Sequence, residues 1–394
     1  MSDPVVADPY SALRPRLAAK LAGFSAAVPD SADRPKMISY RPDRSRFPVP
    51  ELVLFALRDV LGWRWYGAGE KVRWTVSGAI DGQPIAFELR KFGFTIFRPE
   101  GREDLDERIQ GQLQSALREV ERFLAPVAER QVALGEVLIV NRFIEFDGRY
   151  RFFRQLADDA YARGAGPVRK NEHGPADTSV ARLNEATRAI NAKLAATREG
   201  FFYSTAMVDS YFSSLEHRLV LLRAFTGTPL AEGELLRLLA AKWNEKLKMI
   251  LTPPFSRDVE SALGRMRRIK ERIRNPFAHG GVENDKGSLF FHLPKIGAIP
   301  ANFTHFEDSV RFSVLPVDAD DHAESCATFD ALDALLSTGR LAGPDQLLKG
   351  SVDPSFDAKT LAEYADALAG GAEAVEAFIE HWSSAWERHV NMDY

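Results

Sequence analysis

Residues 274–280 read Arg-Asn-Pro-Phe-Ala-His-Gly, and this stretch says more about the fold than any other part of the chain. Arg274 and His279 stand five positions apart, with the polar Asn275 beside the arginine. An imidazole titrates near pH ~6.5, so it can give or take a proton close to neutrality. A guanidinium is permanently charged and binds phosphate oxygens through a planar set of donors. The stretch therefore combines a proton-transfer group with a phosphate-binding group.

Amphipathic helices are predicted in front of this stretch, over 178–198, 200–226 and 231–251. In the second of them the apolar residues recur at spacings of three and four, which is typical of one buried helix face. The residues of this stripe are Val208, Phe212, Leu215, Leu219 and Leu222. The third of these helices is expected to end before Pro253-Pro254, because proline cannot continue a helix.

A further helix, predicted over 256–274, leads into the motif. Ser256 is a suitable N-cap, and the apolar residues Ala262, Met266, Ile269 and Ile273 make its buried stripe. Three cations lie along one border of that stripe: Arg267, Lys270 and Arg274. The proline at 276 disfavours helix at Asn275, so we expect the helix to end or kink there, with His279 just beyond.

The motif and its helices resemble the R-x4-H motif of the HEPN superfamily (higher eukaryote and prokaryote nucleotide-binding domains). In that family the residue after the arginine is usually polar, often asparagine, and a glycine commonly follows the histidine. Asn275 and Gly280 match these positions. The resemblance covers about residues 180–295 and implies an antiparallel helical bundle, whereas the rest of the chain resembles no family that we recognise.

The resemblance implies a metal-independent endoribonuclease that needs no cofactor. His279 would act as general base on a ribose 2′-hydroxyl or as general acid for the leaving 5′-oxygen, and Arg274 would stabilise the charge on phosphorus. Asn275 would position the substrate or His279. Many HEPN nucleases carry an acidic residue on an earlier helix that faces the motif, and Glu216 is our candidate for it. RNA would also be bound by the cations that precede the motif, Arg267 and Lys270.

One motif supplies one histidine and one arginine, which is little for a reaction that needs both an acid and a base. HEPN proteins bring two motifs together by dimerising, so we expect a homodimer through the helices over 200–280. The resemblance further implies a role in phage defence or stress, as an abortive-infection or toxin-like nuclease. An antitoxin or another regulatory protein would restrain it.

Two alternatives stay open from the residues alone. The domain can be a non-catalytic HEPN module that binds nucleotides or a partner protein. It can also be a helical interaction protein with an accidental motif, in which Arg274 caps a helix and His279 lies in a turn. Glu216 can likewise be an ordinary surface glutamate.

The N-terminal region reads as an α+β domain over 51–165, preceded by an extended, Pro- and Arg-rich arm over 1–50. A helix is predicted over 50–62. Asp81-Gly82 is a hairpin turn signal between alternating segments, and Asp147-Gly148 suggests a second hairpin over 137–154. A long amphipathic helix is expected over 102–129. Aromatic residues interleave with Arg64, and we interpret them as core and its rim rather than as base-stacking groups: Trp63, Trp65, Tyr66 and Trp74.

The expected organisation continues with a linker over 166–178, the HEPN-like helical domain over 179–300 and a mainly helical extension over 301–394. The fold class is thus mostly α with an α+β N-terminal part. The extension has 5 Lys+Arg against 18 Asp+Glu, a net charge of −13, so the first 300 residues carry +9. A basic body attracts phosphate. The acidic part can mask that body, repel nucleic acid or aid solubility.

Composition excludes several other classes of protein. Cys326 is the single cysteine, which rules out an internal disulfide and a cysteine-based zinc site. The eight histidines show no metal-ligand spacing, and no phosphate-binding loop or dinucleotide fingerprint is present. No run of about 18 apolar residues and no signal peptide is found, so we expect no membrane association and a reducing cytoplasm.

Overall fold

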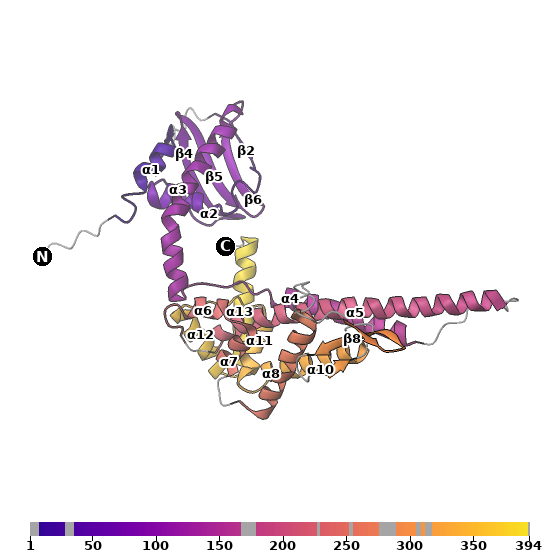
Figure 1. Ribbon diagram of the computed structural model, residues 1–394. Coiled ribbons are helices and arrows are strands. Elements are labelled where there is room, and N and C mark those ends of the chain that lie inside the picture. Colours follow the sequence, from indigo (N-terminus) through magenta and orange to yellow (C-terminus); the bar gives the residue numbers. More distant parts are fainter. Residues whose placement is uncertain are drawn as a thin grey trace. The chain divides into compact units, whose positions relative to one another are not determined.

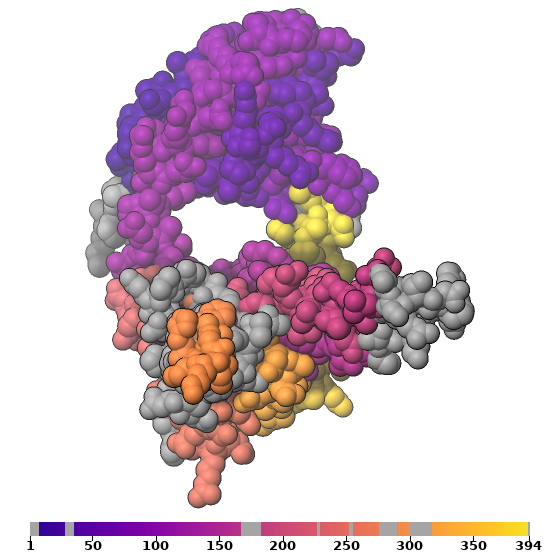
Figure 2. All heavy atoms as spheres, turned by 45° about the vertical axis from the view of Figure 1, so that its right-hand side comes forward, coloured from indigo at the N-terminus to yellow at the C-terminus, as the bar shows by residue number. Residues whose placement is uncertain are grey.

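The computed structural model describes residues 8–27, 35–166, 179–226, 229–251, 255–275, 289–304, 309–311 and 317–392, which Figure 2 colours by residue number. The chain divides into two compact units. Unit 1 comprises Met1–Ala133 and Glu380–Tyr394, and unit 2 comprises Leu134–Ile379. The fold is mostly helical with an α+β N-terminal part, as the sequence predicts.

Unit 1 is built on an antiparallel sheet with strand order β1-β4-β5-β6-β2 (Figure 1). Its long strands are β4 (Val72–Ile80), β5 (Gln83–Arg90) and β6 (Gly93–Pro99). The short ones are β1 (Phe24–Ser25), β2 (Met37–Tyr40) and β3 (Trp65–Tyr66), which pairs with β4. Asp81 and Gly82 both have positive φ, 47° and 75°, as a tight two-residue hairpin turn requires. The predicted hairpin is confirmed.

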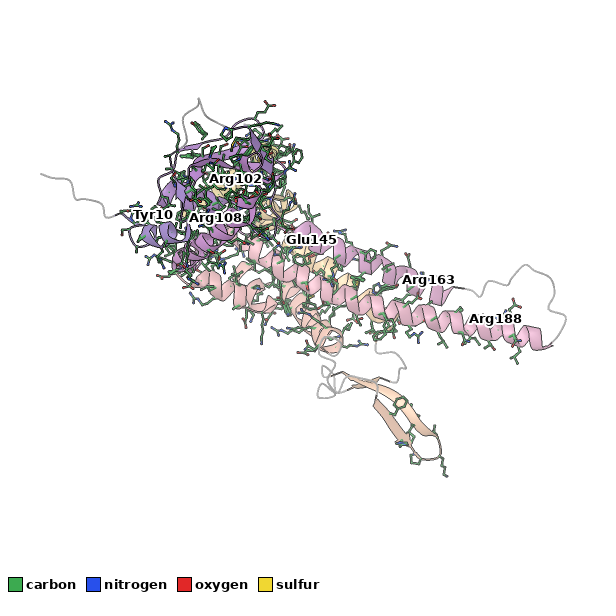
Figure 3. All side chains as sticks on the ribbon, turned by 90° about the horizontal axis from the view of Figure 1, so that it is seen from above. Tyr10, Arg102, Arg108, Glu145, Arg163 and Arg188 are labelled. Atoms are coloured by element: carbon green, nitrogen blue, oxygen red, sulfur yellow. The ribbon has the colours of Figure 1, made fainter. Side chains whose placement is uncertain are left out.

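One face of this sheet is covered by helices. They are α1 (Arg14–Lys20), α2 (Glu51–Leu54), which continues as the π-helix η2 (Phe55–Val60), and α3 (Asp104–Leu134). Their apolar residues share one core with the inward residues of the strands, for example Leu17, Leu113 and Phe87. Tyr10, labelled in Figure 3, packs edge-on against Phe55 with the ring centroids 5.4 Å apart.

The prediction of an extended arm over 1–50 is wrong for its described residues. This stretch contains α1, β1 and β2, and it buries Leu13, Leu17 and Phe47 in the core of unit 1. The apolar residues at 13, 17 and 21 recur every four positions, a helical signal that the prolines and arginines around them obscure.

The aromatic cluster is only partly core. Trp63 and Trp74 are buried, whereas Trp65 and Tyr66 are 42% and 58% exposed, which agrees with the predicted core and its rim. Both exposed residues lie on β3, which pairs only with β4.

The main helices of unit 2 are α4 (Phe143–Ala165) and α5 (Ser179–Ala224). They run antiparallel, because Arg163 pairs with Glu199 while Tyr150 contacts Tyr211. The predicted hairpin over 137–154 is therefore wrong: Asp147-Gly148 lies inside α4, whose aromatic residues are packed on α5. Figure 1 shows α5 continuing well beyond the end of α4.

The two helices predicted over 178–198 and 200–226 are one continuous helix. Gly200 does not break α5. A Cβ at this position would come within 2.7 Å of the Tyr161 ring, so the glycine allows α4 to approach closely.

The following helices differ from prediction in their ends. The helix predicted over 231–251 is divided into α6 (Glu234–Ala240) and α7 (Trp243–Leu251) by the extended Ala241. The helix predicted over 256–274 is α8 (Arg257–Ile269), which continues as the π-helix η3 (Lys270–Arg274). Ser256 caps it as predicted, since its side chain accepts a hydrogen bond from Val259 N at 3.3 Å.

The C-terminal part begins with a three-stranded sheet of β7 (Leu289–Leu293), β8 (Gly297–Thr304) and β9 (Ser309–Arg311). The helical turn η5 (Gly339–Leu341) and four helices follow: α10 (Ala319–Leu336), α11 (Ala342–Lys349), α12 (Ala358–Ala369) and α13 (Ala372–Asn391). No helix in the described ranges is both long and apolar enough to cross a membrane.

Helix α10 packs along α5 through contacts that repeat every seven residues of α5. Ser204 contacts His322, Tyr211 stacks on Phe329 with centroids 3.8 Å apart, and Arg218 reaches Asp333. Arg218 is only 4% exposed on its side chain and donates to Asp333 at 2.8 Å and to Asp345 of α11 at 2.6 Å. This buried charge network ties three helices together.

Replacement of Arg218 by alanine should lower the free energy of unfolding by about 3 kcal/mol, because it leaves the buried Asp345 and the half-buried Asp333 without their main partner. Lys349, which still contacts Asp345, keeps the loss near the lower end of the range for such pairs. Urea denaturation followed by circular dichroism measures it. The matched control is Arg151→Ala, because Arg151 pairs with Asp147 on the surface. This substitution should lower the free energy of unfolding by less than about 0.5 kcal/mol. Equal losses in the two variants would contradict the assigned role of Arg218.

Candidate functional site

The candidate site lies where the end of α8 and η3 packs on α5. All five residues of the predicted α5 stripe are buried, and so are Ala262, Met266, Ile269 and Ile273 of the predicted α8 stripe. Both stripes are buried as the spacing predicts, and η3, which continues α8, lies against α5. The borders of these stripes carry Asp209 and Glu216 on α5 and the motif arginine, Arg274, on η3.

Arg274 is held by three side chains of α5. Its Nε donates to Asp209 Oδ1 at 3.2 Å, and its Nη1 lies 3.6 Å from Glu216 Oε1. Its guanidinium carbon stands 5.1 Å from the centroid of the Phe212 ring. With 22% of its side chain exposed, Arg274 is fixed against an apolar floor yet reachable from solvent.

This arrangement leaves part of the guanidinium available. Among the described residues, Nη2 of Arg274 forms no hydrogen bond. A guanidinium held at Nε and Nη1 keeps its plane and can present the remaining donors to an oxyanion. The structure thus brings the predicted Arg274 and Glu216 together and adds Asp209. The sequence carried a signal for Asp209, because positions 209 and 216 are seven apart and share one helix face.

The predicted cations Lys270 and Arg267 differ in their surroundings. Lys270 is half-buried one turn before Arg274, and burial, followed by repulsion from Arg274, lowers the pKa of its ammonium group. Nearby Glu216 opposes this shift. Arg267 is exposed on α8. The site therefore has two closely spaced cations, Lys270 and Arg274, next to two carboxylates.

The rest of the motif is described only in part. Asn275 is half-buried and helical, with φ −62° and ψ −46°, so the expected loss of helix does not occur at this residue. The switch from α to π geometry falls over Lys270–Arg274, directly before Pro276. Proline clashes with the carbonyl of the preceding turn, and a local change of helical geometry is a common response to it. His279 and Gly280 lie outside the described residues.

Two other histidines of unit 2 have structural surroundings. His217 Nε2 accepts a hydrogen bond from the backbone N of Arg142 at 3.0 Å, and burial lowers the pKa of its ring. His322 is buried between Ser204 and Asp158, each 2.9 Å from one ring nitrogen. Ser204 is almost fully buried, so this Ser-His-Asp arrangement joins three helices but offers a substrate no access. The described residues contain no group of three or more metal-binding side chains.

Comparisons of this chain with protein-family models, with curated proteins and with solved structures found no match. The function is therefore argued from the residues of the site and their geometry.

A double-mutant cycle tests the pairing of Arg274 with Asp209. We expect Arg274→Gln and Asp209→Asn to show a coupling energy of about 0.5–1 kcal/mol in urea denaturation, since the pair is hydrogen-bonded but partly exposed. Coupling with Glu216→Gln should be weaker, because its oxygen lies 3.6 Å away. Arg267→Gln is the matched control and should show no coupling with Asp209. If Arg267→Gln couples with Asp209→Asn as strongly as Arg274→Gln does, the coupling energy comes from long-range electrostatics. The specific contact between Arg274 and Asp209 is then not supported.

Proposed function

We propose that this protein is a metal-independent endoribonuclease of the HEPN type, acting in the cytoplasm. The observation that carries the proposal is the fixed guanidinium of Arg274, clamped by Asp209 and Glu216 five positions before His279. A surface arginine that merely aids solubility does not need two carboxylates and an aromatic ring to orient it. An arginine that must meet a phosphate in one orientation does.

In the proposed reaction the ribose 2′-hydroxyl attacks the adjacent phosphorus, and the bond to the 5′-oxygen breaks. His279 takes the proton of the 2′-hydroxyl or gives one to the departing 5′-oxygen. Arg274 stabilises the negative charge that builds on the non-bridging oxygens. The products are a 2′,3′-cyclic phosphate, which water later opens, and a 5′-hydroxyl. DNA lacks the attacking hydroxyl and stays intact.

The neighbouring residues take supporting roles in this proposal. Asp209 and Glu216 are positioning residues, because they act through Arg274 rather than on the substrate. Lys270 stands one turn from Arg274 and adds a second positive charge for the phosphate backbone, with the exposed Arg267 further along the helix. Asn275 positions either the substrate or His279.

Wild-type protein in excess EDTA should cut single-stranded RNA and leave 2′,3′-cyclic phosphate ends. His279→Ala and Arg274→Ala should each lose at least about 100-fold in rate, the usual scale for an acid–base group or an oxyanion-stabilising donor. Gel analysis of labelled RNA and mass spectrometry of the 3′ ends measure both. A substrate with one deoxyribose should resist cleavage at that position only.

The matched control for this experiment is His381→Ala, which removes an exposed histidine of α13 and should leave the rate unchanged. Cleavage at the deoxy position would refute the mechanism. If RNA stays intact with wild-type protein while binding depends on Arg274, the domain is a non-catalytic binding module instead.

We further propose that the nuclease acts in phage defence or stress and is restrained by an antitoxin or another regulatory protein. A ribonuclease without such restraint would damage the RNA of its own cell. The support for this setting is the resemblance of the motif alone.

A homodimer through the helices over 200–280 is part of the proposal, since it supplies two histidines and two arginines. The described part of this range exposes several apolar side chains: Phe202, Leu236, Leu239 and Met249. Analytical ultracentrifugation should give twice the monomer mass, and Leu236→Glu with Leu239→Glu should shift it to the monomer and abolish cleavage. Ile296→Glu is the control, because Ile296 is exposed outside this range. A wild-type monomer that cuts RNA would contradict the dimer.

A further inference from the structure

We propose that a cavity in unit 1, at the turn between β5 and β6, seats one nucleotide of single-stranded RNA. The base would stack on Phe92, and its phosphate would meet Arg41 and Arg44. This site is separate from Arg274 and goes beyond the proposed function, since it requires binding but no cleavage.

The cavity has a volume of about 620 Å³, within the ~300–1,000 Å³ range of small-molecule sites. One wall is the loop after β2, with Arg41, Pro42 and Arg44, and the other is the β5–β6 turn with Phe92. Two features fix the loop. Phe47 is buried with its ring centroid 5.2 Å from that of Phe94, and Asp43 Oδ1 accepts a hydrogen bond from Ser45 N at 2.8 Å.

Phe92 is the stacking surface. It is 65% exposed, although an apolar ring of this size is usually buried. The Arg41 guanidinium lies over this ring, 5.7 Å from its centroid, so the ring already holds a cation on one face at the cavity. Bases stack on aromatic rings irrespective of sequence, and arginine adds to such stacking. Free bases are offered by single strands, whereas a duplex keeps its bases stacked on one another.

The charge around the cavity is complementary to a polyanion. Residues 35–99 contain 11 Lys+Arg and 6 Asp+Glu, a net charge of +5. Neither Arg41 nor Arg44 forms an ion pair with any described residue. The one carboxylate of the lining, Asp43, is engaged by the backbone and hydroxyl of Ser45, and these hydrogen bonds lower the pKa of its carboxyl group. Arg41 and Arg44 therefore set the character of the cavity rim.

A peptide ligand is less well matched. An acidic peptide would use the arginines but would leave the exposed phenyl ring without a flat partner of its own size. A nucleotide uses both features, because its phosphate and its base are separated by the sugar. The exposed Trp65 and Tyr66 of β3 offer further stacking surfaces on the same sheet.

The test measures binding of a fluorescein-labelled 12-nucleotide oligouridylate by fluorescence anisotropy. The full-length His279→Ala protein is used so that RNA stays intact. Phe92→Ala should weaken binding about tenfold, as expected for the loss of one stacked base, and Phe92→Trp should retain it. Arg41→Ala with Arg44→Ala should also weaken binding and reduce the slope of log K against log salt by about 0.7, the value for one phosphate contact on a single strand.

The matched control is Arg102→Ala with Arg108→Ala, which removes the same charge from the turn just before α3 and from α3 itself. Both residues are labelled in Figure 3, and Arg108 pairs with Asp81 of the β4–β5 turn, at the other end of β5 from the cavity. This control should bind as the parent does. The proposal is overturned if Phe92→Ala binds normally, if both double variants lose affinity equally, or if an acidic peptide binds more tightly than the oligonucleotide.

The same measurements are repeated with a single-stranded deoxyoligonucleotide, which the nuclease would not cut, so His279 can be left unchanged. Any effect of the His279→Ala substitution on folding is thereby avoided. Since binding alone is measured, failure of this proposal leaves the nuclease proposal untouched, and the converse also holds.

Discussion

A helix of 46 residues in water must have its apolar side covered, and the way α5 meets this constraint determines the rest of unit 2. Residues seven apart on a helix share one face, and Ser204, Tyr211 and Arg218 do so on α5. They meet His322, Phe329 and Asp333 of α10, which therefore runs parallel to α5. At the end of this row Arg218 is buried, and a buried charge is tolerated only with its carboxylates in place. The constraint thus fixes α10 and α11 as well as α5.

The same helix positions the candidate site. Phe212 belongs to the buried stripe of α5, while Asp209 and Glu216 lie at its border and hold Arg274. Any shift of α8 along α5 would break these contacts, so packing of the stripes and orientation of the guanidinium are coupled. The ion pairs themselves are partly exposed and worth at most about 1 kcal/mol. A phosphate can therefore compete with the carboxylates for the arginine without unfolding the packed stripes.

The sequence predicts which residues of α5 and α8 are buried better than it predicts where the helices begin and end. Periodicity identified the buried stripes of α5 and α8, and these bring Glu216 to Arg274. Turn chemistry identified the Asp81-Gly82 hairpin, yet the same dipeptide type at Asp147-Gly148 lies within α4. The difference is tertiary, because burial of Tyr150 against Tyr211 and Phe329 stabilises helix where local propensity favours a turn. Gly200 is a similar case, since its role is seen only once the Tyr161 ring is in place.

The uneven distribution of charge has a structural explanation that sequence alone left open. Acidic residues of α10 and α11 pair with arginines of α4, α5 and α8: Asp330 with Arg154, Asp333 and Asp345 with Arg218, Asp321 with Arg272, and Glu324 with Arg268. These carboxylates are engaged within unit 2 and hold its helices together. In unit 1, residues 35–99 carry a net charge of +5, and this stretch includes the loop that lines the cavity at Phe92. The positive charge that the sequence shows before residue 301 is thus partly placed at that cavity.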